Sequence, residues 1–331
     1  MNQTTLLLVG HGSREPSGNQ EIEDFAQAWR AQRPQWRIEV CFIEFSATTL
    51  ERGLDAAAQG TQRVLVLPLI LNAAGHAKMD IPQALEAARA RHGAVHFAYV
   101  PPLSACDPLL AVMLRRLQTA MQALDMPDPH TTGVVLLGRG SSDRQANGEM
   151  AKMARWVQEE SGHLLVDLAF TGITHPRLEG VVQRQVRLGM TQVVVLVYYL
   201  FDGTLVQRIE RQVQHLRTQY PTLRVVSTRY FGFEPEVLAV LEQRVFDALH
   251  GHAQALIACD GCNYRAFAQA HGLGGHTHDD HDHPHGGHDH DHHHDHDHEH
   301  LHTPAPKRCA HAHTAAACTR QPPPAVSFPP L

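Results

Sequence analysis

The sequence lacks the features that mark several large classes of protein. It carries no excess of positive charge, since 28 Lys and Arg stand against 34 Asp and Glu, and so has no basic field that argues for nucleic acid. Its longest apolar runs, such as residues 193–201, are about half of a membrane span. The six cysteines, spread over 331 residues, do not form a disulfide framework. The apolar run at residues 6–9 is too short for a signal-peptide core. We therefore expect a soluble cytoplasmic protein without a membrane or nucleic-acid partner; its oligomeric state is not readable from the sequence.

Histidine, by contrast, is abundant, and its excess is local. Fifteen of the 27 histidines lie in residues 271–302, together with seven Asp, one Glu and no Lys or Arg. We expect this tract to be disordered without metal and to bind Ni²⁺, Co²⁺ or Zn²⁺, as a reservoir, a delivery arm or a buffer. The predicted tail ligands are every second residue from 288 to 300, with acidic residues or His293 between them: His288, His290, His292, His294, His296, His298 and His300.

The rest of the chain alternates short apolar runs with longer amphipathic segments, a pattern typical of parallel α/β sheets covered on both faces. The predicted strands are residues 5–9, 37–42, 64–71, 95–99, 133–137, 164–170, 192–200 and 223–227. The predicted helices are residues 18–32, 49–58, 81–91, 108–124, 143–161, 176–188, 206–220 and 235–249. We expect two tandem, similar domains at residues 1–126 and 131–251, each a four-stranded parallel sheet flanked by helices, and a C-terminal tail at 252–331.

The two halves look like copies of one unit. Residues 7–13 (LLVGHGS) match residues 135–141 (VLLGRGS) at an offset of 128. A tandem duplication explains this more simply than two unrelated α/β domains.

Three polar residues follow successive strands of the first half: His11, Glu44 and His76. In an open parallel sheet such residues share one rim, so two imidazoles and a carboxylate are expected together. They suit a borderline divalent metal such as Fe, Co, Ni or Zn, and proton abstraction near neutral pH. Each alone could be a loop hydrogen-bonder or a solvated strand end. The second half has Arg139 at the position of His11 and Gly172 at that of Glu44, so we expect only the first half to be active.

The segments Leu-Val-Gly-His11-Gly-Ser-Arg14 and Gly-His76-…-Asp80-Ile-Pro82 resemble the sirohydrochlorin chelatases. The long two-domain cobaltochelatases of CbiX type, with a histidine-rich tail, are the most similar. The resemblance implies a lyase that inserts Co²⁺, the substrate metal, into sirohydrochlorin in anaerobic cobalamin (vitamin B12) biosynthesis. It implies that His11 and His76 are catalytic, and that Glu44 is the third member of the set.

Metallation removes two pyrrole protons from sirohydrochlorin while the metal loses its water shell. We therefore expect His11, Glu44 and His76 to hold the metal, with the histidines also accepting protons and Glu44 a third ligand or a relay. Because the tetrapyrrole carries eight carboxylates, its predicted binding residues are cations and donors beside this set: Ser13, Arg14, Lys78 and Arg139. No ATP is needed, and Gly138-Arg-Gly-Ser-Ser matches neither nucleotide-binding fingerprint.

Cys259 and Cys262 form a Cys-x-x-Cys pair beside the histidine tract. The resemblance implies an iron–sulfur cluster here, which would need further ligands such as Cys309 and Cys318 or a second subunit. A metal-binding pair assisted by tail histidines and an idle thiol pair are the alternatives.

Two other functions fit the same residues. A sirohydrochlorin ferrochelatase would use the same site chemistry with Fe²⁺ to make sirohaem. A metal-storage or chaperone protein on a chelatase scaffold would need only the tail, so the His11, Glu44 and His76 set argues against it.

Overall fold

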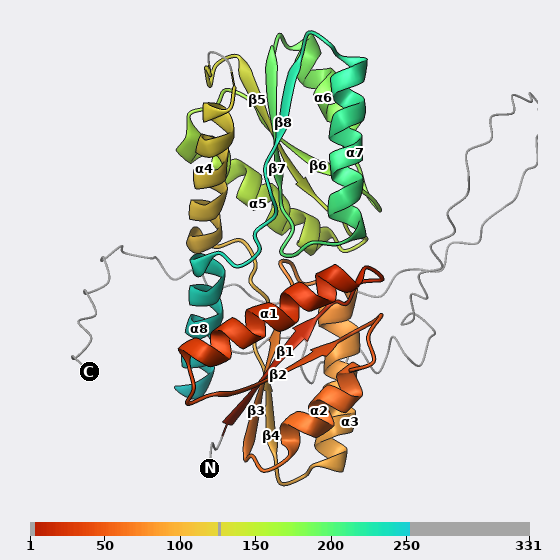
Figure 1. Cartoon of the computed structure of the whole chain (residues 1–331), viewed down its shortest axis with the longest axis vertical. Helices are drawn as coiled ribbons and strands as arrows, with labels where there is room; N and C mark the ends of the chain where they lie inside the picture. The colour runs from red at the N-terminus through yellow and green to blue at the C-terminus, as the bar shows by residue number, and fades with distance from the viewer. Residues whose placement is uncertain (1–3, 125–126, 252–331) are drawn as a thin grey trace, which may run out of the picture. The chain divides into compact units, whose positions relative to one another are not determined.

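The computed structural model describes residues 4–124 and 127–251. It contains two four-stranded parallel sheets, one in each half of the chain (Figure 1). The strands of the first are β1 (Thr4–Gly10), β2 (Arg37–Phe42), β3 (Arg63–Pro68) and β4 (His96–Tyr99). Those of the second are β5 (Thr132–Gly138), β6 (Val166–Phe170), β7 (Gln192–Val197) and β8 (Arg224–Ser227).

The helices alternate with these strands. In the first half they are α1 (Pro16–Gln32), α2 (Leu50–Ala58), the short π-helical segment η1 (His76–Asp80), α3 (Ile81–Arg91) and α4 (Asp107–Gln122). In the second they are α5 (Arg144–Ser161), α6 (Leu178–Arg187), α7 (Thr204–Gln219) and α8 (Pro235–Leu249). None of the helices in the described ranges is long and apolar enough to cross a membrane.

Both sheets have the same topology, which confirms the predicted fold class of two similar units. Their strand orders are β2-β1-β3-β4 and β6-β5-β7-β8, and all neighbouring strands are parallel. The registers also correspond, because Val66 pairs with Tyr99 in the first half and Val195 with Ser227 in the second. Central strands β1 and β5 are almost wholly buried, as expected for a parallel sheet with helices on both faces.

The predicted strands at 64–71 and 192–200 are longer than β3 and β7. These strands end at Pro68 and Val197, three residues earlier, although the apolar run continues. Leu69 and Leu200 remain buried after the chain has left the sheet. Burial in the loop therefore extends the apolar pattern beyond the strand, and periodicity alone cannot find the end.

The last helix of each half packs on the other half. Helix α4 contacts α5 and β7 of the second unit, whereas α8 contacts β3 of the first (Figure 1). A single cluster of buried side chains joins Leu65 and Leu67 of β3 to Val240 of α8, and Leu136 of β5 to the apolar face of α4. The boundary predicted at 126–131 stays a prediction, and in space each sheet is covered by a helix from the other repeat.

Specific polar contacts hold the exchanged helices. Glu242 of α8 accepts hydrogen bonds from Trp29 Nε1 (3.2 Å) and from Arg33 Nε and Nη2 (2.8 and 3.0 Å), both at the end of α1. Arg116 of α4 donates to Glu234 Oε1 (2.6 Å), the residue that precedes α8. Charge-assisted pairs of this kind fix the orientation of helices whose apolar contacts are non-directional.

Candidate functional site

The loop after β1 and the loop after β2 lie in direct contact. The backbone N–H of Glu44 donates to the carbonyl of His11 at 3.0 Å. Gly12 has a φ of 92°, and a Cβ at this position would lie 1.8 Å from the Glu44 carbonyl oxygen. A glycine is needed here because any side chain would separate the two loops. The sequence Gly-His-Gly thus places His11 beside Glu44.

The structure brings together the three polar residues expected on this rim. The rings of His11 and His76 lie at right angles with their centroids 4.8 Å apart. The Nε2 atom of His76 is 3.8 Å from Glu44 Oε1. His76 is the first residue of η1, which follows β3 and leads into α3. All three strands contribute from their carboxyl ends, as the topology requires.

Asp80 orients His76 and was not predicted as a site residue. Its Oδ2 atom lies 2.5 Å from His76 Nδ1. A carboxylate can only accept here, so Nδ1 carries a proton, and Nε2 faces Glu44. Carboxylates commonly orient metal-binding imidazoles in this way. The four-residue spacing of His76 and Asp80 in a helical segment was the available signal.

His11 is held in the neutral form. Its Nδ1 donates to the Gly12 carbonyl at 3.2 Å, which leaves Nε2 to accept from Arg139 Nη1 at 3.1 Å. Burial, the Arg139 guanidinium and His76 together lower the pKa of His11 from 6.5 to about 4. A neutral imidazole can bind a metal ion through Nε2 once Arg139 no longer donates to that atom.

Arg139, which follows β5 of the second half, therefore reaches the site of the first. It occupies the position that corresponds to His11, and Gly172 corresponds to Glu44 because its N–H donates to the Arg139 carbonyl at 3.0 Å. Close by, the hydroxyls of Thr171 and Tyr199 are 2.6 Å apart, and burial raises the pKa of Tyr199 to about 12. The second half supplies a cation and neutral hydroxyls where the first has imidazoles and a carboxylate.

Lys78, Ser13 and Arg14 have partners of their own. Lys78 Nζ contacts Asp143 and donates to Gln145 Oε1 (2.9 Å), both at the start of α5. The Arg14 guanidinium lies over the ring of Phe45, 5.0 Å from its centroid.

Ser13 belongs to a hydrogen-bond motif that both halves share. Its hydroxyl accepts from the N–H of Glu15, and its N–H donates to Asn19 Oδ1. Ser141 makes the corresponding contacts with Asp143 and Asn147. This motif shapes the start of α1 and α5, and the predicted role of Ser13 toward a substrate stays a prediction.

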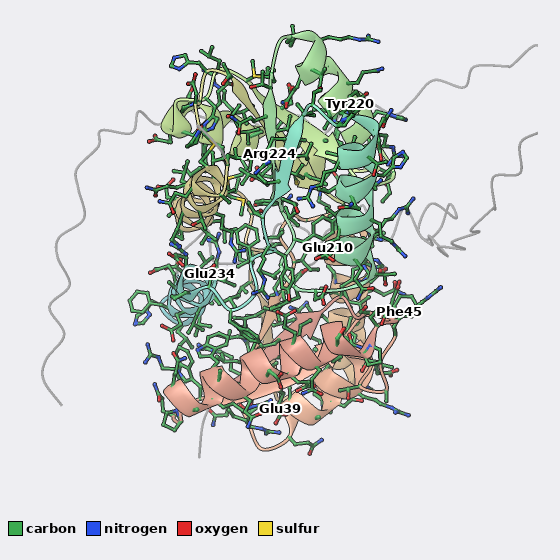
Figure 2. All side chains as sticks on the ribbon, turned by 45° about the horizontal axis from the view of Figure 1, so that its top comes forward. Glu39, Phe45, Glu210, Tyr220, Arg224 and Glu234 are labelled. Carbon is green, nitrogen blue, oxygen red and sulfur yellow. The ribbon has the colours of Figure 1, made fainter. Side chains whose placement is uncertain are left out.

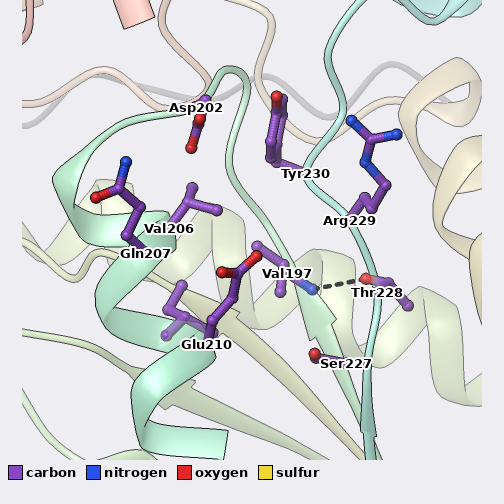
Figure 3. Close-up of a pocket in the computed structure, with 10 residues that line it drawn as sticks. Val197, Asp202, Val206, Gln207, Glu210, Ser227, Thr228, Arg229 and Tyr230 are labelled. Atoms are coloured by element: carbon purple, nitrogen blue, oxygen red, sulfur yellow. Dashed lines mark hydrogen bonds between the residues drawn. The ribbon is translucent and has the colours of Figure 1, made fainter. Parts of the chain in front are cut away.

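A cavity of about 290 Å³ lies elsewhere in the second half, between α7 and the end of β8 (Figure 3). Glu210 is on its helical wall and Ser227 on the opposite wall. Ser227 is the counterpart of Tyr99 by register, and Tyr99 is fully buried in the first half, where its hydroxyl donates to the Ala77 carbonyl. A small residue thus lines the cavity at the position where the other repeat has a buried tyrosine.

Among the described residues, no group of three or more His, Cys, Asp or Glu side chains is arranged to hold a metal ion. His11 Nε2 faces Arg139, and His76 Nε2 is 3.8 Å from Glu44, so these side chains form a cluster but not a closed cage. Such an open arrangement differs from a structural metal site, in which four ligands surround the ion.

The sequence model of the CbiX family matches the chain twice, at residues 5–120 and 133–248. The chain belongs to the CbiX family. The two matches coincide with the two repeats, and the His11, Glu44 and His76 cluster lies in the first.

Named relatives include chelatases for two metals. A sirohydrochlorin cobaltochelatase of Priestia megaterium is 38% identical over 81% of this chain and 86% of its own length. A sirohydrochlorin ferrochelatase of Bacillus subtilis is 29% identical over 80% of this chain and 98% of its own. The solved structure of SirB from Bacillus subtilis with Fe³⁺ covers 77% of this chain and 99% of its own, with a TM-score of 0.66 and 30% identity. A second SirB structure, in complex with cobalt, has a TM-score of 0.63 and 28% identity.

The remaining predicted site residues lie outside the described part of the chain. These are Cys259, Cys262 and the tail histidines from His288 to His300. An iron–sulfur cluster at Cys259 and Cys262, and metal binding by the tail histidines, stay predictions.

Proposed function

We propose that this CbiX-family protein inserts Co²⁺ into sirohydrochlorin without ATP, in anaerobic cobalamin biosynthesis. The observation that carries the proposal is the cluster of His11, His76 and Glu44 at one rim of the first sheet, with ring centroids 4.8 Å apart. The relatives named for this activity support it.

The side chains divide the reaction between them. The lone pairs of His11 Nε2 and His76 Nε2 are the metal ligands, and Glu44 is the third ligand or a proton relay. Because fewer than four protein groups bind the ion, coordination positions stay open for the macrocycle nitrogens. Asp80 keeps the His76 ring in its orientation and tautomer.

Metallation also releases two protons from the macrocycle for each Co²⁺ bound. As the metal leaves for the macrocycle, His11 Nε2 and His76 Nε2 each take one of these protons, and His11, whose pKa is near 4, passes its proton on to solvent at neutral pH. Arg139 Nη1 donates a hydrogen bond to His11 Nε2 in the structure, so the Arg139 side chain must move aside before that atom binds a metal ion or a proton. A peripheral carboxylate of the tetrapyrrole is a stronger partner for a guanidinium than a neutral imidazole, and substrate binding would draw Arg139 away.

The test is anaerobic spectrophotometry of sirohydrochlorin with the full chain and either Co²⁺ or Fe²⁺, against a control without protein. We expect faster insertion of cobalt than of iron. His11→Ala and His76→Ala should abolish insertion while tetrapyrrole binding survives, and Arg139→Ala should have a milder effect. Turnover near that of the wild type in either histidine variant would refute the assignment.

The second candidate is a sirohydrochlorin ferrochelatase, favoured by the ferrochelatase relative and by the SirB structure with Fe³⁺. The same assay decides between them, since a clear preference for Fe²⁺ would reassign the protein to sirohaem synthesis. Acceleration with neither metal would leave metal storage as the function. Deletion of residues 271–302 separates storage from catalysis, because a chelatase should keep its turnover at saturating metal.

A further inference from the structure

Two large apolar side chains are exposed beside the site, one in each half. Phe45 directly follows Glu44 and is 48% exposed, and Ile173 directly follows Gly172 and is 51% exposed. They hold equivalent positions in the two halves. The residue before each donates its backbone N–H to a carbonyl oxygen at 3.0 Å, that of His11 after β1 in the first half and that of Arg139 after β5 in the second. Figure 2 shows Phe45 at the edge of the first half.

Both residues have a backbone conformation that favours glycine. Phe45 has a φ of 52° and Ile173 a φ of 63°. For a bulky residue, and above all a β-branched one, this left-handed region is unfavourable. At another equivalent pair with positive φ, Ser104 and Gly232, one half does have glycine. At Phe45 and Ile173 neither half does, so strain is retained together with an apolar side chain that contributes little to the core.

The two residues flank the contact that joins the halves at the site. The side chains of His11 and Arg139 meet at 3.1 Å, and the hydrogen bonds from Glu44 and Gly172 end on the carbonyls of these same two residues. Phe45 and Ile173 are therefore each one residue beyond a loop that touches the site. Strained, non-glycine residues in such places commonly serve a ligand.

Phe45 is also held in place and paired with a cation. Its carbonyl accepts from Asn19 Nδ2 at 3.2 Å, and the Arg14 guanidinium lies over its ring. An aromatic face next to a guanidinium matches a flat, conjugated ring system that carries carboxylates at its edge. The ring packs against the apolar plane, and the guanidinium pairs with a carboxylate.

We infer that Phe45 and Ile173 form the apolar contacts to the plane of the tetrapyrrole, one from each half, and that Arg14 binds a peripheral carboxylate beside Phe45. This inference rests on the proposed function and names the residues that position its organic substrate over the metal site. These are positioning residues, which set the affinity for the macrocycle rather than for the metal.

The test is a fluorescence titration of metal-free sirohydrochlorin under anaerobic conditions with the full chain and its variants. Phe45→Ala and Ile173→Ala should each weaken binding by about tenfold or more, since each removes a side chain that the ligand buries. Phe45→Leu should restore most of the affinity. The KM for sirohydrochlorin should rise in the alanine variants while the KM for Co²⁺ stays unchanged. Matched controls are Phe246→Ala on α8 and Leu164→Ala before β6, which remove apolar side chains that are 50% and 60% exposed.

Phe45→Gly gives the sharpest result, because strain and ligand contact move in opposite directions. Glycine relieves the positive φ, so the melting temperature should stay equal or rise while sirohydrochlorin affinity falls. If Phe45→Gly and Ile173→Ala bind sirohydrochlorin as tightly as the two control variants, the inference is wrong. The proposed function would still stand in that case, provided that the wild type inserts the metal. A wild-type protein that neither binds nor metallates sirohydrochlorin would overturn both.

Discussion

His11 should make the protein less stable in mild acid, and removing it should abolish this effect. The relevant change is His11→Asn, which keeps a donor for the Gly12 carbonyl and an acceptor for Arg139 but has no titrating group. In the folded protein, burial, Arg139 and His76 lower the pKa of His11 from 6.5 to about 4. The unfolded chain therefore takes up a proton as the pH falls below about 6.5, while the folded chain stays neutral until about pH 4.

The size of the effect follows from these two values. The neutral ring is favoured in the folded state, so its stability contribution is full above pH 6.5 and is lost as the pH falls toward 4. Between pH 7.5 and pH 5, linkage gives a loss of about 2 kcal/mol for the wild type that the asparagine variant does not suffer. For a protein of this size, that corresponds to about 4–8 °C in melting temperature.

The measurement is thermal unfolding of both proteins at pH 7.5 and pH 5 in the presence of a chelator, followed by circular dichroism. The gap between His11→Asn and the wild type should widen in favour of the variant as the pH is lowered. His215→Asn on α7 is the control, because this histidine is exposed. If the wild type and His11→Asn lose stability in parallel, His11 titrates alike in the folded and unfolded states and the reasoning is wrong.

Three further predictions concern the framework around the site. Gly12→Ala should lower the free energy of unfolding by about 2 kcal/mol or more and abolish insertion, because its Cβ would collide with Glu44. Gly60→Ala is the control, since Gly60 also has a positive φ but a Cβ there meets nothing within 4 Å. Equal melting temperatures for the two variants would contradict this prediction. Tyr99→Phe removes the hydrogen bond to Ala77 in η1 and should cost about 1 kcal/mol in chemical unfolding, with slower insertion; an unchanged urea midpoint would argue against it. Glu242→Ala leaves the donors of Trp29 and Arg33 without this acceptor and should cost about 1–3 kcal/mol by the same assay. No change in its midpoint would show that the hydrogen bonds to Glu242 do not stabilise the packing of α8 on α1.

Local pattern was sufficient to predict the elements and the meeting of the site residues. Strand and helix alternation implies parallel sheets, and parallel sheets bring residues that follow successive strands to one rim. His11, Glu44 and His76 are far apart in sequence, yet the structure brings them together for this reason. The repeat at an offset of 128 likewise appears as two sheets of the same order.

Which helix covers which sheet could not be predicted. Helices α4 and α8 each present an apolar stripe that either sheet could accept, and the choice depends on contacts such as Trp29 with Glu242 that are distant in sequence. Arg139 was predicted beside the His11, Glu44 and His76 set, but its hydrogen bond to His11 Nε2 was not. Phe45 and Ile173 escape prediction differently, because a positive φ at a bulky residue runs against local preference and only the three-dimensional structure reveals it.

The exchange of α4 and α8 makes the two repeats dependent on each other. If residues 4–124 were cut from residues 127–251, the first sheet would lose Val237, Val240 and Leu241 from its inner face, and the second would lose the cover of α4. Each piece would then expose an apolar surface that favours aggregation. Unfolding should therefore be one cooperative event for both repeats. Separation of the halves at the site would uncover the apolar faces of α4 and α8, so we expect movement there to be a small sliding of packed layers.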